Sequence, residues 1–338
     1  MKRTIWIPIL LAAAAGQARE LEIYWTDVEG GGSTLIVSPS GQALLVDTGF
    51  GGNEDRDAKR IAETMRSAGI KKIDIAEITH FHGDHVGGAA ALAKLVPIER
   101  FYDHGDSIEA NTDKGASLYD GYKALSAGKR ATVKPGDKIP IQGLDITVVS
   151  ANGEVLSKPL RGAGAPNDLC KNAQTKPADN TENSRSVGFL LRYGKFTFLD
   201  LGDLTWDREM MLACPANKIG TVTLFQATHH GFSNGASGAP AFVWAVRPQV
   251  VVVNNGARKG FNAEAYETLS KIPGVEGIWQ LHRAAMSDAA HNTSEAMTAN
   301  LEEGPADQGK GIKVTASREG KFTVVNQRND FRQTYTAR

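Results

Sequence analysis

The 338-residue sequence predicts a mixed α/β (α+β) fold. Segments with the period of a β-strand and segments with the period of an α-helix follow one another in the first half of the chain, and the same succession returns in the second half. In both halves, histidine and aspartate residues come directly after predicted strands. This recurrence indicates one site assembled at strand ends from both halves of the chain.

Strands in the first half are predicted where apolar residues alternate with polar ones or form short runs between turn residues. These strands span 22–25, 33–37, 42–46, 73–78, 98–102, 131–133, 138–142 and 144–150. A helix is predicted over 57–69, because apolar residues recur on one helical face before Gly69. A second helix is predicted to open at Asp84, and residues 107–128 are predicted to be partly helical.

The second half repeats the pattern after an insertion. Strands are predicted at 186–191, 195–199, 221–227, 249–253, 278–282, 311–317 and 321–326, and helices at 239–246, 263–269 and 294–301. Residues 157–183 are rich in Gly, Pro, Ala, Asn and Lys without a hydrophobic period, which is typical of a lid or binding loop. Because the motif after this insertion contributes to the same site, residues 19–338 are interpreted as one domain.

The first 18 residues have the pattern of a secretory signal peptide. A positively charged start precedes an apolar run over 5–15, and small residues at Gly16 and Ala18 favour cleavage before Arg19. The apolar run is shorter than the ~20 residues that a membrane-spanning helix needs, and no later stretch is long enough. We therefore expect the mature protein to be exported, either to the periplasm or outside the cell.

The charge balance argues against tight nucleic-acid binding. Basic and acidic residues both number 38, and loss of Lys2 and Arg3 with the signal peptide leaves 36 − 38 = −2. A near-neutral chain without long basic clusters has no strong electrostatic footprint for nucleic acid. Cys170 and Cys214 permit a disulfide in an exported protein, and two unpaired buried thiols are the alternative.

The sequence from Thr79 to Gly88, Thr-His-Phe-His-Gly-Asp-His-Val-Gly-Gly, is the strongest indication of a functional site. It follows a predicted strand, so extended backbone directs His80 and His82, two residues apart, to the same side. Asp84 and His85 come next, after a flexible glycine. Nitrogen and oxygen donors in this mixture favour zinc, manganese or iron over calcium or magnesium.

The His-x-His-x-Asp-His motif resembles the signature of the metallo-β-lactamase superfamily of metal-dependent hydrolases. The resemblance covers roughly residues 20–326 and implies the four-layer αββα sandwich of that superfamily. It implies that His80 and His82 bind one metal ion, that Asp84, His85 and His229 bind another, and that Asp203, in Leu-Gly-Asp, bridges the two. It also implies that Asp47, at the end of the strand over 42–46, supports residues 79–88 (the metal loop) from outside the metal site.

Three parts of the predicted site remain open at this point. His229 and His230 are adjacent; His229 is preferred as the metal ligand, which leaves His230 to contact substrate or support a ligand. Many superfamily members supply one more histidine from a Gly-His-Thr segment, but this chain has Thr-Glu-Asn-Ser-Arg-Ser at 181–186. Either Glu182 or Asn183 could donate an oxygen there. The histidines at 104 and 282 also follow strands, and neither is assigned a metal.

Leu-Gly-Asp, His-His-Gly and Asn-Ser-x-Ser look most like the metallo-β-lactamase domain of DNA-uptake competence proteins. That resemblance implies hydrolysis of a phosphodiester by two divalent ions, zinc or manganese, which share a hydroxide that Asp84 helps to position. Hydrolysis of a lactone, lactam or other ester at the same site is the alternative. A third hypothesis is an exported metal-binding protein without activity. The expected partner is a small-molecule or oligomeric ester, and the oligomeric state is open.

Overall fold

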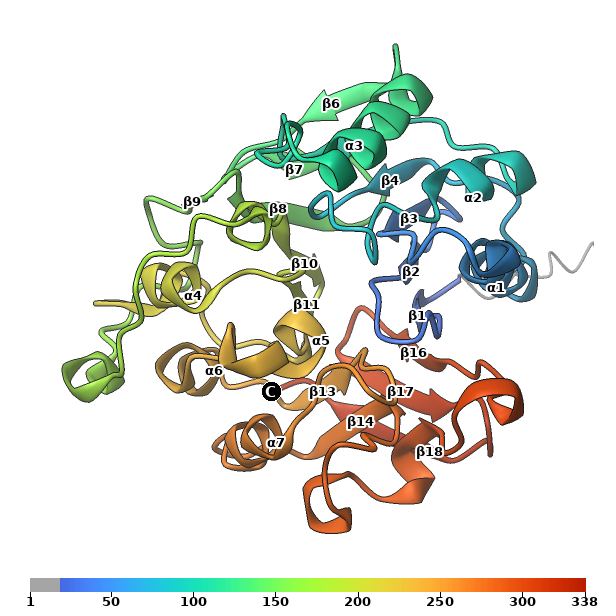
Figure 1. Ribbon diagram of the computed structural model, residues 1–338. Coiled ribbons are helices and arrows are strands. Elements are labelled where there is room, and N and C mark those ends of the chain that lie inside the picture. The colour runs from blue at the N-terminus through green and yellow to red at the C-terminus, as the bar shows by residue number, and fades with distance from the viewer. Residues whose placement is uncertain (1–18) are drawn as a thin grey trace, which may run out of the picture.

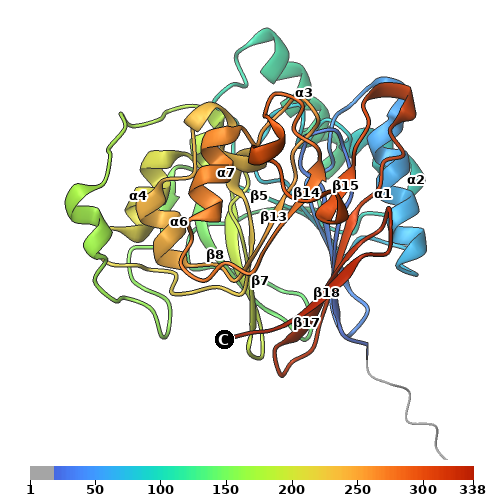
Figure 2. The same cartoon turned by 90° about the horizontal axis from the view of Figure 1, so that it is seen from below.

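The computed structural model describes residues 19–338, and it shows a four-layer sandwich (Figures 1 and 2). Two nine-stranded sheets pack face to face, and helices cover the outer face of each sheet. The predicted αββα architecture is confirmed. The predicted signal peptide, residues 1–18, lies outside the described residues. Within 19–338, no helix is both long and apolar enough to cross a membrane.

The first sheet combines both ends of the chain and has the strand order β18-β17-β16-β1-β2-β3-β4-β5-β6. Its strands are β1 (Leu21–Trp25), β2 (Thr34–Val37), β3 (Ala43–Val46), β4 (Ile75–Glu77), β5 (Phe101–Asp103), β6 (Arg130–Thr132), β16 (Ile312–Ala316), β17 (Lys321–Asn326) and β18 (Arg332–Thr336). Strands β3 to β6 are parallel. The helices of the first half are α1 (Arg56–Ser67), α2 (Ala89–Leu95) and α3 (Asp113–Ser126).

The second sheet has the order β15-β14-β13-β12-β11-β10-β8-β7, with β9 paired to β8. Its strands are β7 (Lys138–Ile139), β8 (Asp145–Ala151), β9 (Glu154–Val155), β10 (Gly188–Tyr193), β11 (Phe196–Asp200), β12 (Leu224–Gln226), β13 (Val250–Val253), β14 (Gly277–His282) and β15 (Thr298–Asn300). Strands β11 to β15 are parallel, so their carboxyl ends share one edge of the sheet. The outer helices are α4 (Trp206–Ala213), α6 (Pro240–Val246) and α7 (Ala263–Ser270).

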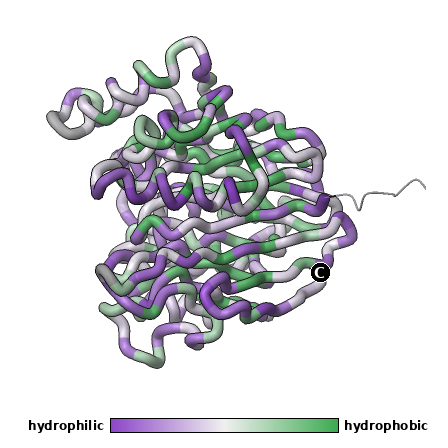
Figure 3. The backbone as a smooth tube through the Cα atoms, turned by 90° about the vertical axis from the view of Figure 1, so that its right-hand side faces the viewer, coloured by the Kyte–Doolittle hydropathy of each residue, from purple (hydrophilic) through white to green (hydrophobic). Residues whose placement is uncertain are grey.

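Burial of apolar side chains between the sheets holds the sandwich together. Trp25 from the first sheet meets Phe198 from the second edge to face, with ring centroids 5.6 Å apart. Strand β13 is four valines, all buried, as expected for a parallel strand covered on both faces. By contrast, buried residues alternate with more exposed ones along β16 and β17 of the first sheet. Figure 3 shows hydrophilic and hydrophobic residues interleaved along the strands of this side of the molecule. This core fixes the relative positions of the strand ends that carry the site.

The boundaries of most elements match the sequence prediction. The helix predicted over 294–301 is wrong: a short 3₁₀ turn leads into β15, because Thr298 and Asn300 extend the parallel sheet beside β14. Strands β9 and β18 and helix α4 were not predicted. Helix α2 begins at Ala89 rather than at Asp84, since residues 84–88 form a turn that holds the predicted ligands.

The insertion at 157–183 is attached to the second helical layer. A disulfide joins Cys170 to Cys214, which directly follows α4. Asn167 donates hydrogen bonds to the carbonyl oxygens of Ala213 and Ala241, at 3.2 Å and 2.9 Å. These contacts fix the middle of the insertion, so its last residues enter the site from a defined position.

Candidate metal centre

Four histidines lie around one carboxylate oxygen, Oδ2 of Asp203. The loop after β4 and the loop after β11 carry His85 and Asp203 from opposite sheets, and the segment after β12 supplies the histidine pair. The Nε2 atoms of His85, His229, His230 and His80 lie 3.3, 3.3, 3.4 and 3.8 Å from Asp203 Oδ2. A carboxylate surrounded by imidazole nitrogens from both sides has the position expected of a bridging ligand.

One tight group of donors combines Asp84, His85, Asp203 and His230. Asp84 Oδ2 lies 3.2 Å from Nε2 of His230 and 3.4 Å from Nε2 of His85, and the two Nε2 atoms are 3.3 Å apart. Nitrogen and oxygen atoms at such separations are close enough to share one cation. The donor set, two imidazoles and two carboxylates, suits a divalent transition metal.

A second donor pair is formed by His80 and His82. His80 Nε2 lies 3.0 Å from His82 Nδ1, so these two atoms face one another. The other nitrogen of each ring has an oxygen partner: Thr79 Oγ1 is 3.1 Å from His80 Nδ1, and Glu109 Oε1 is 3.4 Å from His82 Nε2. Outer oxygens of this kind fix ring orientation and leave the inner nitrogens free for a metal.

Asp47 supports the centre from behind, as the resemblance implied. Its Oδ2 lies 2.6 Å from His85 Nδ1 and accepts the Thr79 hydroxyl at 2.8 Å, while its Oδ1 accepts the Thr79 amide at 2.8 Å. Because the Thr79 hydroxyl donates to Asp47, its oxygen is free to accept a hydrogen bond from His80 Nδ1–H. One buried carboxylate therefore orients both His80 and His85.

The histidine pair lies in an uncommon backbone turn. His229, His230, Gly231 and Phe232 have φ of 55°, 57°, 87° and 68° in succession, although the segment falls within an assigned helix, α5 (Thr228–Phe232). The left-handed conformation costs non-glycine residues roughly 1–2 kcal/mol each, so the surrounding structure must compensate for it. Strain of this kind clusters at functional sites.

The turn separates the two histidines, and the geometry favours the reverse of the predicted order. His230 is buried and belongs to the tight donor group. His229 keeps 13% of its side chain exposed, and its Nδ1 faces Ser237 Oγ at 3.4 Å while its Nε2 faces Asp203. His230 therefore lies inside the tight donor group, and His229 lies on its more open side.

The segment at 181–186 offers one free oxygen. Glu182, one of the two candidate donors, is already engaged: its carboxylate accepts from the Phe81 and Ile108 amides and lies 2.8 Å from His104 Nε2. It therefore anchors the metal loop from outside. Asn183 has a buried Oδ1 without a hydrogen-bond partner among the described residues, which leaves this oxygen available as a donor. His282 is away from the centre, paired with Asp27 at 2.6 Å.

The site contains several buried carboxyl groups, which favour the binding of cations. Burial disfavours a charged imidazole, yet the neighbouring carboxylates, led by Asp203 and Asp47, outweigh it and raise the pKa of His85. Behind the ligands, burial raises the pKa of Asp200 to about 7 and the pKa of Glu77 well above its usual value. Both carboxyl oxygens of Glu77 lack a hydrogen-bond partner within 19–338. Excess buried carboxylate of this kind fits a site for divalent cations.

Lys259 is a site residue that the sequence motifs did not identify. It follows β13, and its ammonium contacts Oδ2 of Asp84 while lying 5.4 Å from the centre of the Phe50 ring. About a third of its side chain is exposed (35%), so the ammonium faces both the donors and solvent. The only signal in the sequence is its place after a strand end, because an isolated lysine in a loop belongs to no metal motif.

The comparisons with known proteins agree with this geometry. The family model described as the metallo-beta-lactamase superfamily matches residues 27–159. A UPF0173 metal-dependent hydrolase of Thermodesulfovibrio yellowstonii is 25% identical over 151 residues, 44% of this chain and 51% of that protein. An atrochrysone carboxyl ACP thioesterase of Aspergillus fumigatus is 33% identical over 141 residues, which cover 38% of this chain and 32% of that enzyme.

A ribonuclease Z of Alkaliphilus oremlandii is 40% identical over 60 residues, 18% of this chain and 17% of that protein. The chain thus matches about half of the length of the hydrolase relative and about a third or less of the other two. Similarity of this extent leaves the substrate open.

Replacing Asp47 with asparagine tests the supporting carboxylate. Asp47→Asn keeps the shape of the side chain but removes the charge that orients His85, so metal affinity should fall about 10–100-fold. Competition with a chromogenic chelator measures the affinity. Asp57→Asn is the matched control, because Asp57 is equally buried but binds the Phe50 amide and Arg56. Equal affinity in Asp47→Asn and wild type would contradict the supporting role.

Proposed function

We propose that the chain is an exported metal-dependent hydrolase of the metallo-β-lactamase superfamily, with two metal ions, acting on a phosphodiester. The observation that carries this proposal is the position of Asp203 between two separate groups of donors. Divalent ions supply a nucleophile at neutral pH and polarise the bond under attack. The protein supplies the donors, their orientation and the contacts to substrate.

Each group of donors would hold one ion. His80 and His82 would hold the first with their facing nitrogens, and the free Oδ1 of Asn183 is the nearest candidate in sequence for a further donor. Asp84, His85 and His230 would hold the second, with Asp203 shared. Zinc and manganese both suit this set of nitrogen and oxygen atoms. A first ion with fewer histidines would be the weaker or more exchangeable of the two.

The preference for a phosphodiester rests on Lys259. Its ammonium is partly exposed beside Asp84, where it can bind an anionic oxygen of substrate. A phosphodiester carries such an oxygen, whereas a neutral ester or lactone does not. The match to a ribonuclease Z and the resemblance to competence proteins support the same bond class. His229, at the open side, provides a second polar group for substrate.

Ester or thioester hydrolysis is the second candidate, and one specific observation favours it. The matches to this chain include fungal acyl carrier protein thioesterases, which are 33–34% identical over 108–141 residues. The same donors and ions would polarise a thioester carbonyl as they would a phosphoryl group. The two candidates differ in the charge at the reacting group, so Lys259 separates them.

Loss of one donor should abolish turnover. With bis-p-nitrophenyl phosphate and added zinc or manganese, wild type should release nitrophenol and His82→Ala should lose at least about 100-fold of that rate, because one ion loses a ligand. His291→Ala, at a partly exposed histidine near α7, is the control and should keep wild-type activity. Activity that survives His82→Ala would contradict the proposed centre.

Substrate charge is tested at Lys259. Lys259→Met keeps much of the length of the side chain but removes the charge, so KM for the anionic diester should rise about tenfold. KM for neutral p-nitrophenyl acetate should stay unchanged. Arg258→Met is the control, since Arg258 is an adjacent exposed cation that pairs with Glu303 at 2.6 Å. An equal rise in KM for both substrates would contradict the role of Lys259 in binding an anionic oxygen.

Export is proposed from the first 18 residues. Amino-terminal sequencing of the protein from periplasm or medium should begin at Arg19, because the small residues before it favour cleavage there. Protein found only in the cytoplasm with an uncleaved start would contradict export. The disulfide between Cys170 and Cys214 agrees with an oxidising compartment.

A further inference from the structure

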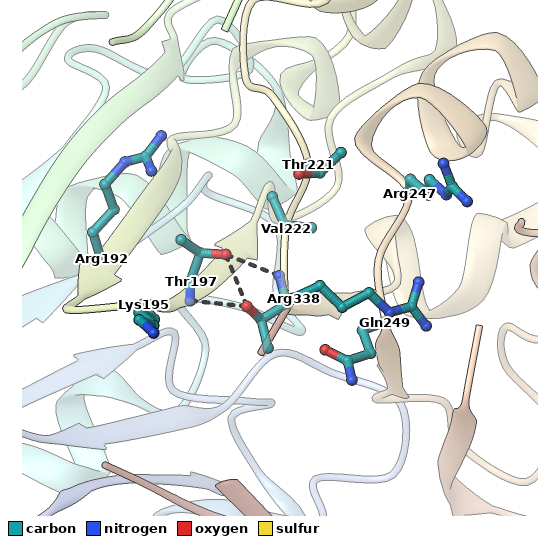
Figure 4. Close-up of a pocket in the computed structure, with 9 residues that line it drawn as sticks. Arg192, Lys195, Thr197, Thr221, Val222, Arg247, Gln249 and Arg338 are labelled. Atoms are coloured by element: carbon teal, nitrogen blue, oxygen red, sulfur yellow. Dashed lines mark hydrogen bonds between the residues drawn. The ribbon is translucent and has the colours of Figure 1, made fainter. Parts of the chain in front are cut away.

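A polar cavity of about 460 Å³ lies at the opposite end of the second sheet from the metal centre (Figure 4). Thr197 lies near the start of β11, Thr223 directly precedes β12, and Gln249 directly precedes β13. The metal donors follow the other ends of β11 and β12. Because β11 has five residues at about 3.3 Å each, roughly 16 Å separate the two ends. This far-end pocket is therefore distinct from the metal centre.

Positive charge lines the far-end pocket. Arg192, Lys195, Arg247 and Arg338 line it, and Figure 4 shows these side chains on both sides of Thr197. Only Arg338 has a carboxylate partner within the described part of the chain, Glu276 at 2.6 Å. Arg247 uses its Nε to donate to the Pro273 carbonyl at 2.9 Å, which fixes the guanidinium and leaves its terminal nitrogens free.

The floor of the far-end pocket is a preformed polar surface. Two hydrogen bonds join Thr197 and Thr223: Thr223 N donates to Thr197 Oγ1 at 2.8 Å, and Thr197 N donates to Thr223 Oγ1 at 3.3 Å. Gln249 is held by hydrogen bonds from its Nε2 to Glu276 Oε2 at 3.1 Å and to the Thr336 carbonyl at 3.0 Å. The floor therefore needs no rearrangement to accept a ligand, which lowers the cost of binding.

We propose that the far-end pocket binds a multivalent oxyanion, such as a phosphate-bearing or polycarboxylate molecule. The guanidinium groups of Arg192 and Arg247 match phosphate and carboxylate oxygens in shape as well as in charge. Cations that face one cavity without carboxylate partners repel one another, and a bound multivalent anion relieves that repulsion. The volume is in the range of small-molecule sites. This site is independent of the proposed hydrolase activity.

The test uses the full-length mature protein loaded with metal and isothermal titration calorimetry at 0.15 M ionic strength, with pyrophosphate and citrate as separate probes. We expect one anion per pocket. Affinity should fall about tenfold or more in Arg192→Ala and in Arg247→Ala, because each loses a charge-assisted contact. Arg100→Ala is the matched control, since this exposed arginine lies on the other sheet just before β5.

The two probes distinguish the source of the oxyanion. Tighter binding of pyrophosphate assigns the pocket to phosphate-bearing ligands, and tighter binding of citrate assigns it to polycarboxylates. Binding should persist in His82→Ala, because that change affects only the metal centre. The proposal is overturned if neither probe binds, or if Arg192→Ala and Arg247→Ala bind as wild type does, which would place the anion on the metal ions instead.

Discussion

Concentration of buried carboxylates around one oxygen of Asp203 is the constraint on which the site depends. Asp203 and Asp84 face the imidazoles, and Asp47, Glu77 and Asp200 are buried behind them. Unpaired buried carboxylates cost several kcal/mol each, so a protein retains them only where cations or protons compensate. The raised pKa values of Glu77 and Asp200 are the proton part of that compensation. Divalent metal ions are the remaining source of positive charge for the carboxylates that stay ionised.

The packed sandwich holds the edges of the two sheets in fixed positions relative to one another. The donors come from loops after β4 in one sheet and after β11 and β12 in the other, so the packed core between the sheets brings Asp203 and His230 to the donors at 80–85. The same rigidity sustains the left-handed turn at His229 and His230, which the chain would not adopt alone. Glu182 adds a further tie, joining the segment before β10 to Phe81 of the metal loop.

The parts of the site that lie close together in the sequence could be predicted. His80, His82, Asp84 and His85 fall within six residues, so their convergence needs only one strand and one turn. The order within the histidine pair depends on positive φ angles, which Thr-His-His-Gly does not reveal. The role of Glu182 depends on its contact with His104, and Lys259 reaches Asp84 from 175 residues away in the chain. Such long-range contacts are set by packing and not by local pattern.

In the fold, too, features set by local sequence were predicted and features set by long-range pairing were not. Strands with strong alternation and the parallel valine strand were located correctly, whereas 298–300 became a strand only because the neighbouring edge of β14 was open to pairing. Propensity favoured a helix there, and tertiary pairing overrode it. The far-end pocket could not be predicted from the sequence either, because its cationic side chains come from segments that are distant in the chain and that the folded sheet brings together.

Anomalous X-ray scattering from crystals of the manganese- or zinc-loaded protein would locate the ions. We expect two peaks beside Asp203, one facing His80 and His82 and the other facing Asp84, His85 and His230. A map with no peak beside Asp203, or with metal only at another cluster such as Asp27 and His282, would contradict this expectation.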